Sequence, residues 1–507
     1  MSRYPHKISK SRFVSGAQCQ KKLYFDLFRK DLKPPVSPQQ QALFNTGHEI
    51  GHLAQQVFPG GIDLSPETYY DFSDAIDQTS EAITKGQQTI YEAAFYHNEV
   101  LAALDILHHQ DGERWAIEVK SSTAVKDYHL QDAALQYWVM AQSGFTPDKF
   151  FLMHINNAYV KQGPIDAKGL FTLSDITAEV KEKQARVTEK LPILKSLQAN
   201  QEPDIPIGKH CESPFECDYK PHCWKHIPSK NSVFDLKNAR GREWDLYAKG
   251  VVHLADVPVG YNLTSSQQLH IDGVKYDKVN IEEENIASFV EGLTYPIYYF
   301  DFETINSAIP ILDGTKPFQQ VPFQYSLHRV NAPGEPAEHT AFLANPLDFT
   351  ENEGADPLKS LINQLKTDFQ HQGTILAYNA VFEQTVLKAL ATAYPEDAAF
   401  IHQLTERFVD LMDVFQAGWY YTSAMQGSYS IKYVLPALFP ELSYDNLAIG
   451  NGTDASNTFL SMILGSFSGN ETLTRKQLLQ YCEQDTYAMV LLHQELLRVS
   501  YQADTDE

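Results

Sequence analysis

The sequence predicts an α/β protein with two main domains. Its 507 residues exceed what one ordinary hydrophobic core supports. A content of 43% hydrophobic and 12% aromatic residues is typical of a well-packed globular protein. Strand and helix patterns mix over the first part of the chain, and a new apolar strand begins abruptly near Tyr295. We therefore expect domains at residues 1–230 and 291–507, joined by a polar connecting module at 231–290.

Composition also limits the location and the partners of the protein. No apolar run approaches the roughly 18 residues that a membrane span requires, and the N-terminus lacks the apolar core of a signal peptide. We therefore expect a cytoplasmic protein with no membrane partner. The net charge of −23 argues against non-specific coating of nucleic acid, which depends on Lys and Arg. It does not exclude a nuclease, because carboxylate-rich metal sites add negative charge and the segment 207–242 is locally basic.

The first domain begins with a helical pattern over residues 12–28. Two strand patterns, 101–107 and 115–120, flank an Asp-Gly turn, which is the signature of a β-hairpin. A helix is expected over 131–142, a buried strand over 150–155, and helical periodicity over 175–197. These elements predict a mixed sheet with helices packed on it.

The hairpin carries opposite charges at neighbouring positions. Because side chains alternate along a strand, Glu118 and Lys120 share one face, while Ile117 and Val119 point inward. Asp105 lies on the neighbouring strand. Taken alone, these residues could form an ordinary surface hairpin with a salt bridge.

An Asp on one strand followed by Glu-x-Lys on the next resembles the PD-(D/E)xK nucleases. The resemblance implies a restriction-endonuclease-like domain in which Asp105, Glu118 and the carbonyl oxygen of Val119 bind one or two Mg²⁺ or Mn²⁺ ions. Lys120 would position the attacking water and offset developing charge. Glu92 is a candidate supporting acid from an earlier element.

The cysteines are few and unevenly placed. Five residues separate Cys211 from Cys217 and Cys217 from Cys223, and Cys19 lies far upstream of the hairpin. This arrangement resembles the RecB-like branch of the same superfamily, which includes the CRISPR-associated adaptation nucleases. There, one cysteine before the nuclease core and three after it bind a [4Fe–4S] cluster, whose usual ligands are thiolates. The resemblance implies the same cofactor here. Zinc is the competing metal for these cysteines, but structural zinc sites favour shorter spacings between paired cysteines.

The chain departs from this branch at two places. The branch has Gln-x3-Tyr on the helix after the lysine strand, where this chain has Asp132-x3-Gln136. The early helical histidine of the family aligns with Gly51, so His52 is a candidate shifted by one residue, one turn after His48. Alternatively, both histidines are polar positions on an amphipathic helix.

The strand 298–304 predicts a second metal site. Its period of two places Tyr299, Asp301 and Glu303 on one face, and Phe300 and Phe302 on the other, toward a core. Two carboxylates on an apolar strand are costly to desolvate unless a cation compensates them. Divalent Mg²⁺ and Mn²⁺, which prefer oxygen ligands, are the natural compensation.

Later segments add further polar groups in an ordered series. A strand over 374–378 leads into a helix that carries Glu383, and a helix over 474–498 places Tyr481 and Asp485 one turn apart on one face. Asp410 follows an apolar pair, and we prefer it over Asp413 as a further ligand. Cys482 is expected to be a small buried residue.

Asp-x-Glu on a first strand, Asn and then an acid on a helix, and Tyr-x3-Asp on a last helix resemble the DnaQ-like exonucleases of the RNase H-like superfamily. The tyrosine places the chain with the DEDDy subgroup, and the resemblance covers about residues 295–500. It implies a metal-dependent 3′–5′ exonuclease in which Asp301, Glu303, Glu383 and Asp485 hold two Mg²⁺ or Mn²⁺ ions. Tyr481 would orient or deprotonate the attacking water.

The middle motif departs from this pattern. Tyr378-Asn379 followed by Glu383 stands where the family has His-Asn and then Asp. Glutamate reaches further than aspartate, so the resemblance leaves the spacing of the two metals open.

Together, the two resemblances imply a protein with two nuclease sites, similar to a bacterial RecB/DnaQ-type family. DNA is the expected substrate and RNA the alternative, in repair or in defence against foreign DNA. A different hypothesis is a nucleic-acid-binding protein with one active site, in which the other domain grips DNA or RNA. A third is a phosphodiesterase that acts on mononucleotide esters.

Overall fold

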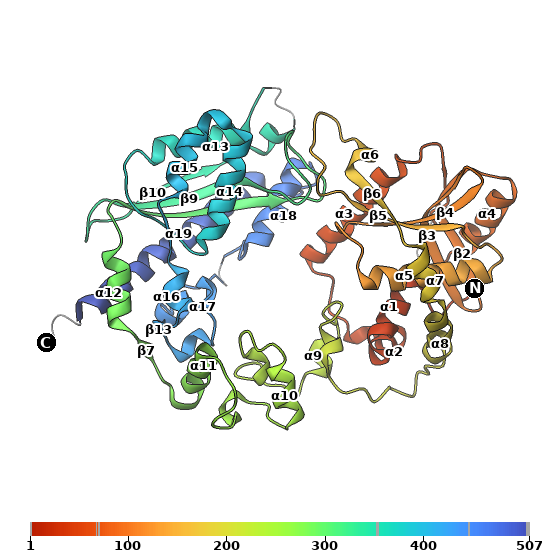
Figure 1. Cartoon of the computed structure of the whole chain (residues 1–507), viewed down its shortest axis with the longest axis horizontal. Coiled ribbons are helices and arrows are strands. Elements are labelled where there is room, and N and C mark those ends of the chain that lie inside the picture. Colours follow the sequence, from red (N-terminus) through yellow and green to blue (C-terminus); the bar gives the residue numbers. More distant parts are fainter. Residues whose placement is uncertain (1–2, 67, 69–70, 351–353, 445–446, 503–507) are drawn as a thin grey trace. The chain divides into compact units, whose positions relative to one another are not determined.

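A computed structural model describes residues 3–502 except 67, 69–70, 351–353 and 445–446, and the chain has a mixed α/β fold (Figure 1). It forms two compact units. Unit 1 comprises residues up to 226 together with 308–318, and unit 2 comprises 227–307 together with the chain from 319 onward. The segment 231–290, expected as a connecting module, therefore groups with unit 2.

Unit 1 is built on a six-stranded mixed sheet with the order β1-β2-β3-β4-β5-β6. Strands β2, β3 and β4 form an antiparallel meander, β5 runs parallel to β4, and β6 is antiparallel to β5. The strands are β1 (Ile62–Asp63), β2 (Thr89–His97), β3 (Val100–Gln110), β4 (Glu113–Lys120), β5 (Lys149–Ile155) and β6 (Phe171–Asp175). The parallel step from β4 to β5 requires a crossover, and helix α5 (Asp127–Gln142) provides it.

The predicted hairpin is confirmed by β3 and β4. Asp111 and Gly112 have positive φ values of 55° and 83°, as the turns that join such strands require. Both faces of the hairpin are covered, because Ala116 packs in one core cluster and Ile117 in another. The hairpin therefore does not lie at the surface, although Glu118 and Lys120 do form the expected salt bridge.

The helices of unit 1 surround this sheet. They are α1 (Lys10–Gln18), α2 (Gln20–Phe28), α3 (Pro38–Gln55), α4 (Ser73–Thr84), α5, α6 (Ala167–Leu170), α7 (Thr177–Glu182), α8 (Gln184–Lys195) and α9 (Lys220–Cys223). The helix expected over 12–28 is interrupted at Cys19, whose backbone is extended (φ −161°, ψ 124°). The pattern over 175–197 likewise divides into α7 and α8.

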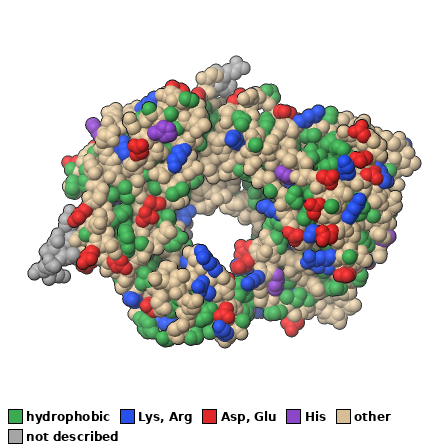
Figure 2. Space-filling view, in the orientation of Figure 1, with side chains coloured by type: hydrophobic (Ala, Val, Ile, Leu, Met, Phe, Trp, Pro, Cys, Tyr) green, Lys and Arg blue, Asp and Glu red, His purple; other side chains and the backbone are tan. Residues whose placement is uncertain are grey.

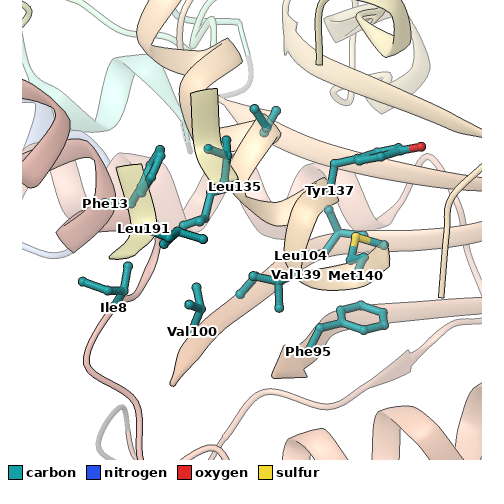
Figure 3. Close-up of a cluster of buried hydrophobic side chains, with 14 of the residues drawn as sticks. Ile8, Phe13, Phe95, Val100, Leu104, Leu135, Tyr137, Val139, Met140 and Leu191 are labelled. Atoms are coloured by element: carbon teal, nitrogen blue, oxygen red, sulfur yellow. The ribbon is translucent and has the colours of Figure 1, made fainter. Parts of the chain in front are cut away.

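Helix α5 packs on one face of the sheet. Figure 3 shows Val139 and Met140 of this helix beside Phe95, Val100 and Leu104 of the strands. All five side chains are buried. On the opposite face, apolar residues of α3 pack in the cluster that contains Ile117, so the hairpin is held between two helices.

The insertion 308–318 completes unit 1. The Lys161 amide donates to the Thr315 carbonyl oxygen (3.0 Å), and the Gly314 amide donates to the Lys161 carbonyl oxygen (2.8 Å). Ala308 is buried in the same apolar cluster as Ile117. Unit 1 is therefore not a continuous stretch of sequence.

Unit 2 contains a five-stranded sheet with the order β10-β9-β8-β11-β12. Strands β8, β9 and β10 are antiparallel neighbours, whereas β11 and β12 run parallel to β8. The strands are β8 (Ile297–Asn306), β9 (Gln320–Val330), β10 (Glu338–Leu343), β11 (Ile375–Ala377) and β12 (Phe408–Asp410). A separate pair joins β7 (Asn280–Ile281) to β13 (Tyr420–Tyr421).

Helices cover both faces of this sheet. The helices of unit 2 are α10 (Arg242–Ala248), α11 (Ser265–Tyr276), α12 (Glu283–Glu291), α13 (Pro357–Asp368), α14 (Ala380–Ala393), α15 (Ala398–Thr405), α16 (Met412–Gln416), α17 (Ile431–Leu438), α18 (Gly452–Ile463) and α19 (Glu471–Gln502). Tyr299 bonds to His493 of α19 (2.7 Å), while the ring of Phe300 contacts that of Phe369 after α13. The predicted division of β8 into two faces is confirmed.

The segment 231–290, expected as a polar connecting module, is folded. Val233, Leu246, Leu254 and Ile271 form a small apolar core of their own. Helix α12 packs against α19, and Ile286 is fully buried there. These apolar residues are scattered over separate short helices, so the sequence pattern predicts a polar segment.

Two surface properties concern possible partners. Within the residues that the structure describes, no helix combines the length and apolar content needed to cross a membrane. On the parts of each unit visible in Figure 2, acidic and basic side chains are interspersed.

Candidate metal and cluster sites

A pocket of about 430 Å³ in unit 2 brings together four of the predicted site residues. Asp301 and Glu303 reach it from β8, and Tyr481 and Asp485 reach it from α19. Glu303 and Asp485 are only 6% and 9% exposed. Strand alternation on β8 and one-turn spacing on α19 thus direct two pairs of side chains into one cavity.

These carboxyl groups lie too close together to be ionised easily. Burial and the neighbouring Asp485 raise the pKa of Asp301 well above its usual range, and burial and Asp301 do the same for Glu303. Burial raises the pKa of Asp485 to about 6. Carboxylates that are buried this close together must be neutralised either by protonation or by bound cations.

Glu383 lies behind this pocket rather than on its wall. It is 2% exposed, in the first turn of α14, and its Oε2 atom has no hydrogen-bond partner. Burial and the nearby Asp301 raise its pKa well above the usual range. An unpaired buried carboxylate oxygen calls for an explanation, and a metal ligand role fits this atom.

Asp410, expected as a further metal ligand, has a structural role instead. Its carboxylate accepts hydrogen bonds from the backbone amides of Asn379 (2.9 Å), Ala380 (2.9 Å) and Met412 (3.0 Å). It therefore holds the first turn of α14, where amides lack partners within the helix, and it does not line the pocket. Asp413 does not line it either.

Sequence reasoning missed three contributors to this site. Tyr444 donates a hydrogen bond to Asp485 (2.6 Å), and Lys432 lines the pocket. Cys482 is buried as expected, but its Sγ atom also lies 3.6 Å from Asp301 Oδ2. No spacing in the sequence links Tyr444 or Lys432 to the acids, so only the tertiary fold reveals them.

A second pocket, of about 560 Å³, lies in unit 1. Glu92, Asp105, Val119 and Lys120 line it. Helix α3 adds His48 and His52 to the same wall. The structure therefore brings the early helical histidines to the predicted site, although the sequence alone left their place open.

Glu118 is buried beneath this pocket and is fully paired. Its carboxylate accepts hydrogen bonds from Lys120 (2.6 Å), Lys10 (3.0 and 3.1 Å) and Gln136 (2.8 Å). Burial alone would raise the pKa of Glu118, but Lys10 and Lys120 outweigh it and lower this pKa. Asp132 holds Lys120 from the other side (2.8 Å). Lys10 was not anticipated from the sequence.

Asp105 and Glu92 have the opposite electrostatic character. Burial and Glu118 raise the pKa of Asp105 to about 7, although Asp105 accepts a 2.6 Å bond from the Val119 amide. Burial and Asp105 raise the pKa of Glu92 to about 8. Glu92 also has a φ of 55°, which is rare for a side-chain-bearing residue within a strand. Such strain clusters at functional sites.

We expect this pair to make the stability of the metal-free protein depend on pH. The pKa of Glu92 rises from its ordinary 4.5 to about 8 on folding, so its contribution is complete below about pH 4.5 and is lost as pH rises through about 8. In thermal unfolding with a chelator, Glu92→Gln should show a smaller fall in Tm over this window than the wild type. Exposed Glu189→Gln should follow the wild type. Identical falls in all three proteins would refute the assignment.

The four predicted cluster cysteines converge on one small cavity. Cys19 comes from the break between α1 and α2, and Cys211, Cys217 and Cys223 come from the far end of unit 1. All are free thiols. Burial raises the pKa of Cys217 to about 11 and also raises that of Cys19. Burial thus disfavours the thiolate form of Cys19 and Cys217, so the donor set fits a metal or a cluster that replaces the thiol protons.

Comparison with known proteins gives relatives but no function. A family model described as a domain of unknown function (DUF2779) matches residues 298–430. An uncharacterized protein of Mycoplasma pneumoniae is 28% identical over 208 residues, 38% of this chain and 31% of that protein. An uncharacterized protein of Mycoplasma genitalium is 28% identical over 225 residues, 39% of this chain and 32% of its own length. The chain spans about a third of these relatives.

Proposed function

We propose that unit 2 is a metal-dependent 3′–5′ exonuclease acting on nucleic acid. The observation that carries this proposal is the pocket in which Asp301, Glu303 and Asp485 meet Tyr481. The sheet order, three antiparallel strands followed by two parallel ones, is consistent with the resemblance to DnaQ-like exonucleases. Asp301, Glu303 and Asp485 would hold Mg²⁺ or Mn²⁺, with the unpaired Oε2 of Glu383 behind them.

The metal ions, Lys432 and the polar side chains of the pocket would have different roles, which follow from their chemistry. Two divalent ions, when bound, supply activation of water and stabilisation of the leaving oxygen. Lys432 is the cation on the pocket wall and would attract a phosphate. The mouth is lined further by polar side chains, including Gln320, Ser456 and Asn457, which can hydrogen-bond a nucleotide.

Tyr481 would orient water rather than deprotonate it. Burial and the nearby Asp485 raise the pKa of this phenol far above its usual range, so it stays neutral. Its hydroxyl lines the pocket together with Asp485, where its oxygen can accept a hydrogen bond from water. This choice narrows the two roles that the sequence left open.

The test is the replacement Tyr481→Phe. We expect the wild type to shorten 5′-labelled single-stranded DNA stepwise in Mg²⁺ or Mn²⁺, and the variant to lose about 10²-fold in kcat, the size expected when the reacting water is no longer held in position. The apparent metal affinity should change little, because the carboxylates remain. Tyr487→Phe, at an exposed position of the same helix, is the control. A wild type inactive on DNA and RNA, or equal kcat in both variants, contradicts the proposal.

We propose that unit 1 contains a second nuclease site, similar to that of the RecB-like nucleases. Asp105 and the Val119 carbonyl oxygen would bind metal beside Glu92, with Lys120 directed at the water. The strand order with α5 as crossover supports this resemblance. Glu118, tied to two lysines, would act by positioning Lys120, unless metal binding displaces Lys10.

The alternative is that unit 1 only grips nucleic acid. The two hypotheses differ when Asp301 and Asp105 are both replaced. A second nuclease leaves activity in Asp301→Asn that the further change Asp105→Asn removes. If unit 1 only binds nucleic acid, the single variant Asp301→Asn already lacks this activity.

We propose that the four cysteines hold a [4Fe–4S] cluster that ties the two ends of unit 1. A single tetrahedral zinc, with Zn–S bonds of about 2.3 Å, would draw the sulfurs to about 3.8 Å from one another. Among the residues that the structure describes, these four sulfurs form no group with all separations within 4.8 Å. The five-residue gaps between the last three cysteines, longer than those usual in structural zinc sites, support a cluster over zinc.

A further inference from the structure

Two histidines and a glutamate converge on the outer part of the unit 2 sheet. His328 on β9 and His339 on β10 are directly paired across the antiparallel ladder, and their ring centroids are 4.5 Å apart. Glu483 reaches them from α19, with its Oε1 atom 3.7 Å from His339 Nδ1. One ligand atom of each residue lies within 4.8 Å of the other two.

Buried hydroxyl groups fix which nitrogen of each ring is free. Thr486 Oγ1 donates its single proton to the Glu483 carbonyl oxygen (3.1 Å). It must therefore accept from its other two partners, His328 Nδ1 and Ser326 Oγ, both at 2.8 Å. Ser326 then accepts from His339 Nε2 (2.9 Å). This assignment uses each proton of the network once.

As a result, one nitrogen of each histidine ring has a lone pair that is available to bind a metal. With protons on His328 Nδ1 and His339 Nε2, the lone pairs lie on His328 Nε2 and His339 Nδ1. A hydrogen bond to the second ring nitrogen is the usual support of a metal-binding histidine, because it fixes the tautomer and the ring orientation. Ser326 and Thr486 are both fully buried, so this support is rigid.

We propose that His328, His339 and Glu483 bind a Zn²⁺ ion. Two imidazoles and a carboxylate suit zinc, whereas Mg²⁺ and Mn²⁺ prefer oxygen ligands. The site is therefore chemically distinct from the carboxylate pocket. Glu483 is half-exposed, so ions can enter from solvent and water can complete four-coordination.

The ion would join β9 and β10 to the helix that carries Tyr481 and Asp485. Ser326, which supports the histidines, is the cross-strand partner of Asp301. The role assigned to the zinc is to hold α19 in register on the sheet. This inference stands on geometry alone and does not depend on the proposed exonuclease activity.

The experiment counts zinc bound per chain by the full protein. Metal-free protein in excess Mg²⁺ is titrated with Zn²⁺ against a chromophoric chelator, for the wild type, His339→Ala and Glu483→Gln. His402→Ala, at an exposed position of α15, is the matched control. Zinc taken up by the cysteines or by the carboxylate pocket is common to all four proteins and cancels in the comparison.

We expect His339→Ala to bind about one equivalent fewer than the wild type, and Glu483→Gln to bind that equivalent at least about 10-fold more weakly. Zinc should raise Tm more in the wild type than in His339→Ala. Because His339 and Glu483 are partly exposed, their replacement leaves the core intact. Equal stoichiometry in the wild type and His339→Ala, or the same loss in His402→Ala, overturns the proposal.

Discussion

Replacing Asp301 by Asn is expected to reduce metal-dependent degradation of single-stranded DNA on the order of 10³-fold, the size typical of losing one strong electrostatic stabiliser of a transition state. The amide keeps the shape of the side chain but removes the charge that would hold a metal. Initial rates on 5′-labelled DNA at saturating Mg²⁺ measure the effect. Asp256→Asn, at an exposed position of unit 2, is the control.

The same change should leave the fold intact. Burial and neighbouring carboxylates disfavour the charged form of Asp301, as its raised pKa shows. Without metal, neutralising this group removes repulsion, so Tm in a chelator should be unchanged or higher. A variant that is folded and inactive places Asp301 in the reaction. Activity within a few-fold of the wild type that also survives the further change Asp105→Asn would remove the main support of the proposed function.

Activity that survives in Asp301→Asn has a separate meaning. The double variant with Asp105→Asn tests whether it arises in unit 1. Asp105 is partly buried, and burial and Glu118 raise its pKa to about 7, so replacing it by Asn should also stabilise the fold when metal is absent. Loss of the surviving activity in the double variant supports a second nuclease, and its persistence excludes Asp105 from the chemistry.

Replacing Cys211 by Ser is expected to remove the iron and the broad visible absorbance from protein purified without air. Cys211 is the most buried of the four cluster cysteines, at 7% exposed. Structural metal ions contribute about 10 kcal/mol or more to the folding of small metal-dependent domains. Because unit 1 has its own apolar cores, we expect a smaller but still large loss of stability, seen as a lower Tm.

Cys482→Ser is the matched control, because this cysteine lies beside Asp301 and outside the cluster. Its iron content should equal that of the wild type. If the wild type contains stoichiometric zinc and no iron, the four cysteines form a zinc site and the cluster proposal is wrong. Iron retained in Cys211→Ser would exclude Cys211 as a ligand.

Local periodicity was sufficient to predict the strands and faces that carry the acids. The alternation on β8 and the one-turn spacing of Tyr481 and Asp485 each depend on a few neighbouring residues, and the structure brings both pairs into one pocket. The Asp-Gly turn likewise identified the β3–β4 hairpin. In each case the secondary structure alone determines which side chains point the same way.

The groups that neutralise or orient these acids could not be predicted in this way. Lys10 reaches Glu118 across 108 residues of sequence, and Tyr444 reaches Asp485 across 41. Such contacts depend on how elements pack, and no local pattern records them. Asp410 shows the converse, because a carboxylate that looked like a ligand instead satisfies the amides at the start of α14.

The insertion 308–318 limits how the two proposed activities can be dissected. Unit 1 takes this segment from the connection between β8 and β9, and Ala308 fills part of its core. Unit 2 in turn needs α12, whose Ile286 covers the apolar side of α19. A cut at residue 230 would therefore leave unit 1 without this segment, and a cut at residue 290 would in addition separate most of α12 from unit 2. Point substitutions in the intact chain, rather than separated fragments, are the appropriate way to assign each activity.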